Sequence, residues 1–271
     1  MPHVRPAAVA GAFYPGQGAA LSRAVQTLID AVPPAPDAPQ VAPKALIVPH
    51  AGYIYSGSTA ALAYAQLKPW RNTIRRVVLL GPVHRVPVRG LALPGATSFA
   101  TPLGAVQIDA AAITALAGLP QVVVSPAAHA QEHALEVQLP FLQTVLDNFT
   151  LVPLAVGDAT PAEVAQVLEA LWGGPETLIV ISSDLSHFLP YRTAQAVDHA
   201  TVEALLALAG PVTHAQACGG TPVNGLLLAA RRHGLQPHLL GLCNSGDTAG
   251  DKERVVGYAS LSFTEVSDGV H

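Results

Sequence analysis

The segment Thr177–His187, TLIVISSDLSH, joins a run of leucine, isoleucine and valine to a polar loop. Two other segments follow the same plan, namely Ala45–His50, ALIVPH, and Arg76–His84, RVVLLGPVH. Short apolar runs without polar alternation are typical of strands that are buried on both faces of a parallel sheet. These segments therefore predict the centre of an α/β fold.

The rest of the chain alternates similar strands with helix-period segments, which implies a central, largely parallel mixed sheet flanked by helices. No shift in composition marks a boundary, so residues 1–271 are expected to form a single domain. Leu91–Ile108 is expected to form a hairpin, and the proline-rich Val32–Lys44 an extended link after a first amphipathic helix. The remaining expected strands are Gln121–Ser125, Thr150–Val156, Pro237–Cys243 and Val255–Phe263. The expected helices are Gly57–Leu67, Ala110–Ala117, Glu132–Leu146, Pro161–Leu171, Ala194–Leu208 and Pro222–His233.

The composition excludes several classes of protein. Half of the 271 residues are hydrophobic, 12% are charged and the formal net charge is −4, which excludes a disordered chain, a coiled coil and a protein that coats nucleic acid. No basic patch or amphipathic surface helix indicates a nucleic-acid or membrane partner. The charge-free stretch Ala110–Gln131 is not a membrane span, because Gly118, Pro120 and Pro126 interrupt it. No secretory signal is apparent, so a cytoplasmic location is expected. The small number of charged residues is compatible with an apolar interface in a homo-oligomer.

Polar residues follow three of the expected strands. His50, His84 and the pair Asp184 and His187 come directly after buried runs. Ligands of open α/β sheets bind at the carboxyl ends of the strands, so these side chains can meet although they are far apart in the chain. His50 and His84 are therefore candidates to share a metal, although a single histidine at such a position is more often a loop hydrogen-bonding group.

Two further motifs are candidates for metal chemistry. Cys218 precedes the helix expected to begin at Pro222, where the helix field, and more strongly a bound cation, favours the thiolate form. The alternative is that Cys218 is a small buried apolar residue, the role expected for Cys243. His129–His133, HAQEH, matches the H-x-x-E-H pattern of inverted zinc peptidases, but Pro126 lies so close upstream that His129 is expected to fall off the helix.

Seven motifs occur in a characteristic order and cover nearly the whole chain. They are Gly11–Pro15, Pro49–Gly57, Leu80–His84, Thr101–Gly104, Glu132–Phe141, Ser182–His187 and Cys218–Pro222. Together they resemble the Memo family, which includes the B component of AmmeMemoRadiSam gene sets.

The resemblance implies a fold similar to class III extradiol dioxygenases and a metal held by His50, His84 and Cys218. Asp184, His187 and His133 would line the same pocket. Those dioxygenases bind ferrous iron through two histidines and a carboxylate, so a cysteine as third ligand argues against ordinary ring cleavage.

The leading hypothesis is a mononuclear metal enzyme that performs oxygen-dependent or related redox chemistry on a small oxygen-bearing substrate. Fe(II) is the expected metal, with copper and zinc as alternatives. His187 is the expected acid or base, Asp184 would orient it, the hydroxyl of Tyr53 would close the pocket, and Glu132 and His133 would line it. The alternatives are a binding or scaffold protein that recognises a partner or a modified peptide without catalysis, and a metal store or redox buffer.

Overall fold

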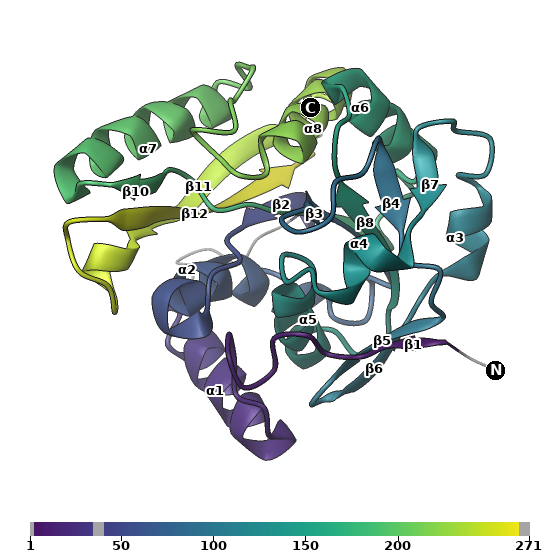
Figure 1. Cartoon of the computed structure of the whole chain (residues 1–271), viewed down its shortest axis with the longest axis horizontal. Helices are drawn as coiled ribbons and strands as arrows, with labels where there is room; N and C mark the ends of the chain where they lie inside the picture. Colours follow the sequence, from purple (N-terminus) through teal and green to yellow (C-terminus); the bar gives the residue numbers. More distant parts are fainter. Residues whose placement is uncertain (1–2, 35–40, 266–271) are drawn as a thin grey trace, which may run out of the picture.

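A mixed sheet of nine strands forms the centre of the protein (Figure 1). The structure is a computed structural model and describes residues 3–34 and 41–265. Four neighbouring strands are parallel, in the order β2 (Pro43–Val48), β9 (Thr177–Ser182), β3 (Arg76–Pro82) and β8 (Thr150–Val156). Their carboxyl ends therefore lie along one edge of the sheet.

Further strands extend this parallel centre on both sides. β12 (Val255–Thr264) runs antiparallel to β2, and it also pairs with β10 (His187–Leu189) and β11 (Gln236–Asn244). On the other side, β4 (Leu91–Leu93) runs antiparallel to β8 and pairs in parallel with β7 (Val122–Val124). The prediction of a largely parallel mixed sheet is confirmed, and each of the strands expected from the sequence is present.

Eight α-helices and three short 3-10 helices are found among the described residues. They are α1 (Gly18–Asp30), α2 (Tyr53–Ala65), α3 (Ala110–Thr114), α4 (Pro126–Ala130), α5 (Leu139–Val145), α6 (Pro161–Ala170), α7 (Tyr191–Leu206), α8 (Gly220–Arg232), η1 (Lys68–Trp70), η2 (Glu136–Gln138) and η3 (Ser245–Asp247). Within residues 3–34 and 41–265, no helix is both long and apolar enough to cross a membrane.

Helices cover both faces of the sheet because successive strand residues point to opposite sides. In β2, Ala45 and Ile47 belong to one buried cluster, whereas Leu46 and Val48 belong to another. The first cluster includes residues of α6, α7 and α8, and the second includes residues of α1, α2 and α5. Figure 1 shows these two sets of helices on opposite sides of the sheet.

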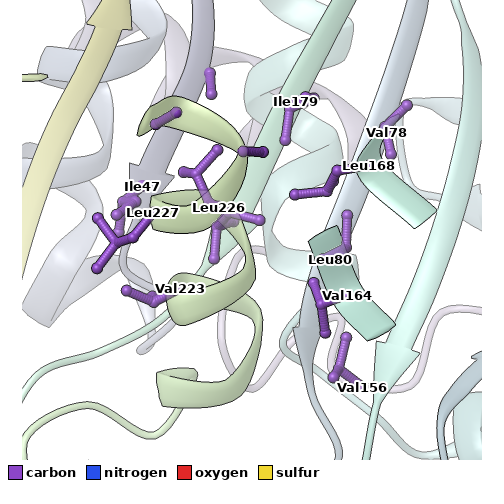
Figure 2. Packing of buried hydrophobic residues seen from close by; sticks show 14 of the residues in the cluster. Ile47, Val78, Leu80, Val156, Val164, Leu168, Ile179, Val223, Leu226 and Leu227 are labelled. Carbon is purple, nitrogen blue, oxygen red and sulfur yellow. The ribbon is translucent and has the colours of Figure 1, made fainter. Parts of the chain in front are cut away.

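Helix α8 packs closely on α6 and on the sheet. Figure 2 shows Leu226 and Leu227 of α8 in one buried cluster with Ile47 of β2 and Val164 of α6. The close approach requires Gly225, because a Cβ at this position would lie 2.3 Å from Cγ1 of Val164. This packing fixes the amino end of α8, where one of the candidate ligands stands.

The amino-terminal residues belong to a separate, three-stranded sheet. β1 (Val4–Arg5) pairs in parallel with β5 (Ser98–Thr101), which forms an antiparallel hairpin with β6 (Gly104–Gln107). This confirms the hairpin expected within Leu91–Ile108, although the first residues of that segment join the main sheet as β4. The first amphipathic helix is present as α1, whereas residues 35–40 of the proline-rich link lie outside the described residues.

One predicted helix is wrong over half of its length. Glu132–Leu146 was expected to be a single helix, but residues 131–135 are irregular and a 3-10 turn leads into α5. The carboxylate of Glu132 accepts the backbone N–H groups of His133 and Ala134, each at 2.9 Å, and this competes with helical hydrogen bonds. The helix begins only near Pro140, a residue tolerated in a first turn.

Candidate metal centre

Three histidines converge at the carboxyl edge of the parallel strands. His50 follows β2 and His84 follows β3, as the strand-end rule predicts. His133 comes from the irregular segment before η2. One ring nitrogen of each histidine lies within 4.8 Å of the other two, a spacing at which one metal ion can be held.

The segment that carries His133 reaches the sheet because β3 contains a glycine. A Cβ at Gly81 would lie 3.0 Å from Cδ2 of Leu135, 3.2 Å from Cβ of Ala134 and 3.3 Å from Cβ of Ser182. These contacts are tighter than ordinary van der Waals distances, so a larger residue would push the segment away from the strand. Gly81 therefore allows His133 to approach the two strand-end histidines.

Hydrogen bonds determine the tautomer of His50, whose Nδ1 lies 3.0 Å from Oγ of Ser182. The Ser182 hydroxyl donates to the carbonyl of Ala134 at 2.6 Å, so its oxygen must accept from Nδ1–H of His50. The side-chain amide of Gln138 donates to the same oxygen at 2.8 Å and to the carbonyl of Pro49 at 2.9 Å. The lone pair of His50 is therefore on Nε2, the atom available to a metal.

Glu132 holds the other two histidines. Its Oε1 lies 2.8 Å from Nδ1 of His84 and 3.3 Å from Nδ1 of His133, and its Oε2 accepts the backbone N–H of His84 at 2.6 Å. Burial alone would raise the pKa of Glu132, but these donors outweigh burial and lower the pKa to about 2. The ionised carboxylate accepts from Nδ1–H of His84 and leaves Nε2 of that ring with a lone pair. Glu132 thereby orients the rings of His84 and His133.

Burial keeps two of the three histidines neutral. Loss of solvent, reinforced by the charges of neighbouring histidines, lowers the pKa of His50 to about 3 and that of His133 to about 4. Neutral imidazole is the form that binds metals, so these rings require no loss of a proton at neutral pH. The donor chemistry of the cluster therefore fits a transition metal ion.

Cys218 borders this cluster, and its Sγ lies 3.3 Å from Nε2 of His50. It precedes Gly219, the residue that caps α8. The expected thiolate is not favoured in the metal-free protein, because burial, followed by the nearby charge of Asp184, raises the pKa of the thiol to about 12. Loss of solvent thus outweighs the helix field, and only a bound cation would favour release of the proton.

Asp184 lies on the loop after β9, and His187 is the first residue of β10. The Oδ1 of Asp184 accepts the backbone N–H of His50 at 2.7 Å, and its Oδ2 lies 3.9 Å from Nε2 of that residue. Burial raises the pKa of this carboxyl. Nδ1 of His187 donates to the carbonyl of Leu185 at 2.8 Å, which leaves the lone pair on Nε2. The next residue, Phe188, has a left-handed φ of 58° and is 59% exposed.

Tyr53 contacts the chain segment that follows His133. Its hydroxyl donates to the carbonyl of Val137 at 2.7 Å, and its ring contacts Phe141 with the ring centroids 4.9 Å apart. The sequence suggested that this hydroxyl would close the substrate pocket. The contact instead directs the hydroxyl to the backbone that follows His133.

A hollow of about 450 Å³ adjoins the cluster. His84 and Cys218 lie on its wall, with His214, Thr221 and several apolar side chains of the loops after β3 and β8. His214, which sequence reasoning did not single out, is 3.1 Å from Oγ1 of Thr221 through Nε2 and 3.3 Å from the carbonyl of Cys218 through Nδ1. The volume is that of a typical small-molecule site.

His129 stays outside the cluster although it belongs to the H-x-x-E-H pattern. Helix α4 ends at Ala130, so His129 and His133 do not share a helix face. His129 is buried, and its Nε2 donates to the carbonyl of Ala92 at 2.7 Å. This arrangement does not form the zinc site of an inverted peptidase.

Sequence reasoning missed the residues that orient the ligands. Ser182 ends a fully buried strand, and the apolar pattern of that strand gives no sign that its hydroxyl faces a histidine. Gln138 lies within a segment expected to be a regular helix. Their partners are distant in the chain, and a local pattern therefore carries no signal for these contacts.

Comparisons with known proteins agree with the motifs. A sequence model of the family described as "Memo-like protein" matches residues 5–262. Curated relatives called MEMO1 family proteins include one from Ignicoccus hospitalis, 35% identical over 96% of this chain and 98% of its own, and one from Aquifex aeolicus, 34% identical over 96% and 99%. In fold, the chain is similar to the crystal structure of an uncharacterized protein, JW3007, from Escherichia coli K12, with a TM-score of 0.50, 15% identity, and coverage of 80% of this chain and 98% of that one. The chain belongs to the family of Memo-like proteins.

Proposed function

We propose that this protein is a mononuclear metal-dependent redox enzyme that acts on a small oxygen-bearing molecule. The observation that carries the proposal is the convergence of His50, His84 and His133 beside an open hollow of about 450 Å³. Ligands on a rigid sheet edge with an adjoining small-molecule cavity are the usual arrangement of a catalytic metal site.

His50, His84 and His133 would hold the ion, and Cys218 would be a further ligand. Ligand atoms bonded to one tetrahedral ion at about 2.0–2.3 Å lie roughly 3.5 Å apart. The separation of 3.3 Å between Nε2 of His50 and Sγ of Cys218 agrees with that value. The metal-binding role proposed from the sequence for Cys218 is thus supported by its position beside His50.

Fe(II) is the metal we favour, with copper and zinc as alternatives. Imidazole ligands suit all three ions, whereas a thiolate shifts preference toward copper and zinc. When bound, Fe(II) would supply redox chemistry with oxygen, and zinc would supply Lewis-acid chemistry only. The experiment below separates these ions.

His187 would move a proton at the substrate, because Nδ1–H is held by a backbone carbonyl and Nε2 carries the lone pair. Asp184 would support the opposite side of His50 through the backbone N–H that it accepts. The apolar side chains that line part of the hollow would contact the body of the substrate.

Metal analysis of protein purified without oxygen tests the proposal. We expect stoichiometric iron in the wild type and its loss in His50→Ala, His84→Ala and His133→Ala. His129→Gln is the matched control, because His129 is a buried histidine outside the cluster and its variant should keep the metal. Copper or zinc lost from the same variants would change the metal assignment, and no metal under any loading condition would refute the proposal.

Catalysis is tested with His187→Ala. We expect this variant to retain its metal and to lose at least about 100-fold of oxygen-dependent turnover in a screen of small oxygen-bearing compounds. A protein that binds a partner or a modified peptide without catalysis would show no turnover in the wild type and unchanged partner affinity in the variant.

A further inference from the structure

Arg5 is a buried arginine far from the candidate ligands in sequence but connected to them in space. It is 4% exposed, and each of its three nitrogens has a different acceptor. Nε donates to the carbonyl of His129 at 3.0 Å, Nη2 donates to the carbonyl of Glu132 at 2.6 Å, and Nη1 forms an ion pair with Glu136. The guanidinium thus holds three points of the segment that contains His133.

The amino-terminal segment Val4–Tyr14 completes this attachment. Glu136 is fully buried, and besides Arg5 it accepts the backbone N–H of Ala8 at 2.7 Å and that of Val9 at 3.0 Å. The hydroxyl of Tyr14 donates to the same carboxylate at 2.5 Å. A buried carboxylate with this many donors has its charge compensated and its position determined.

The same segment also contacts the ligands directly. The ring of Phe13 packs against that of His133 with centroids 4.8 Å apart, and the carbonyl of Phe13 accepts the backbone N–H of Tyr53 at 2.8 Å. The carboxylate of Glu132 in turn accepts hydrogen bonds from Nδ1 of His84 and from the backbone N–H of His133. Arg5 holds the main chain of Glu132, so it controls where that carboxylate lies.

We infer that Arg5 is a positioning residue of the metal centre, and that Val4–Tyr14 forms part of the site although it supplies no ligand. Arg5 fixes the irregular segment from His129 to Glu136, and Glu132 then aims the rings of His84 and His133. The effect on metal affinity rests on the function proposed above, whereas the orientation of the rings exists without metal.

Arg5→Lys tests the inference while it keeps the buried positive charge beside Glu136. A lysine has one nitrogen and cannot reproduce a planar fork that reaches three separate acceptors. Arg76→Lys is the matched control, because Arg76 pairs with Asp109 at 2.8 Å at the beginning of β3, away from the histidines. Arg5→Gln combined with Glu136→Gln leaves no uncompensated charge and serves as a second variant if Arg5→Lys folds poorly.

The first measurement needs no metal. In 15N NMR spectra of the metal-free wild type, the ring nitrogens of His84 should report a single tautomer protonated on Nδ1, and Arg76→Lys should preserve it. We expect Arg5→Lys to shift or average these signals. Unchanged ring signals in both the Arg5→Lys and the double variant would overturn the inference.

The second measurement is titration with Co²⁺, monitored by its visible absorption. We expect Arg5→Lys to bind Co²⁺ about 10–100-fold more weakly, with an altered spectrum, as is usual when a group that supports a ligand is lost. Equal affinity and an identical spectrum, despite reduced stability, would reduce Arg5 to a structural residue and refute its role in the centre. Failure of the wild type to bind any metal would refute the proposed function, while the NMR comparison would still decide whether Arg5 orients the rings.

Discussion

The two ends of the parallel strands both carry buried nitrogen groups beside hollows of similar size, about 410 Å³ at the amino end and about 450 Å³ at the carboxyl end. At the amino end, Nζ of Lys44 donates to the carbonyl groups of Trp172, Gly173, Gly174 and Thr177. At the carboxyl end, His50 and His84 use Nδ1 for hydrogen bonds to Ser182 and Glu132, and Nε2 of His50 faces Sγ of Cys218 at 3.3 Å.

A hollow beside buried nitrogen atoms does not by itself identify a site. Lys44 has three donors and all are engaged by main-chain carbonyls, so its charge stabilises the fold. One ring nitrogen each of His50, His84 and His133 lies within 4.8 Å of the other two, a spacing that suits a shared metal ion. Acid, Lys44→Met and Ser182→Ala test whether the two ends of the strands differ in this way.

Acid should produce the largest effect, and it should act at the carboxyl end. In the folded metal-free protein, burial lowers the pKa of His133 to about 4 and that of His50 to about 3, whereas the unfolded chain has ordinary histidines. Between these values and about pH 6.5 the unfolded chain binds more protons, so stability is complete above pH 6.5 and falls as the pH decreases. His133 alone would contribute about 3 kcal/mol to this loss.

Urea unfolding of the metal-free protein at pH 7 and pH 4.5 measures this loss. We expect His50→Gln to reduce the pH dependence, because an amide does not titrate in this range. Lys44→Met, at the other end of the strands, should keep the pH dependence of the wild type. If His50→Gln lost as much free energy of unfolding between pH 7 and pH 4.5 as the wild type, groups other than His50 would cause the acid sensitivity.

Lys44→Met should give the second largest effect. The change leaves buried carbonyls without their charged donor, and we expect a loss of about 2 kcal/mol in the free energy of unfolding. Metal content should not change, since Lys44 lies at the opposite end of the strands from the histidines. Lys68→Met is a suitable comparison, because Lys68 pairs with Asp30 on the surface and its loss should cost less than about 0.5 kcal/mol. A loss of metal in Lys44→Met would contradict the separation of the two ends.

Ser182→Ala should give the smallest of the three effects. It removes the acceptor of Nδ1–H of His50, so the ring can rotate or change tautomer, and we expect about tenfold weaker metal binding. Ser260→Ala provides the control, since that buried hydroxyl donates to the carbonyl of Thr59 instead. Isothermal titration with Zn²⁺ measures both variants. If Ser182→Ala bound Zn²⁺ as tightly as Ser260→Ala, Ser182 would not orient the ring of His50.

Much of the fold could be predicted because the strands are long apolar runs whose position in an α/β sheet follows general rules. The same rules placed His50, His84 and Asp184 near one another, since each directly follows a parallel strand. The chain around His133 could not be predicted in this way. Its backbone is determined by the carboxylate of Glu132 and by Arg5, and the contact with Arg5 depends on residues from a different sheet.

The contacts of Arg5 also bear on the order in which the protein folds. Arg5 and His129, whose carbonyl it binds, are 124 positions apart in the chain, and His50 and Cys218 are 168 positions apart. Contacts between such distant parts of a chain require closure of long loops and form slowly. During synthesis the contacts of Arg5 with His129, Glu132 and Glu136 can form only after that segment has emerged from the ribosome. The metal centre is consequently expected to assemble late, and metal insertion into a nascent chain would precede a complete ligand set.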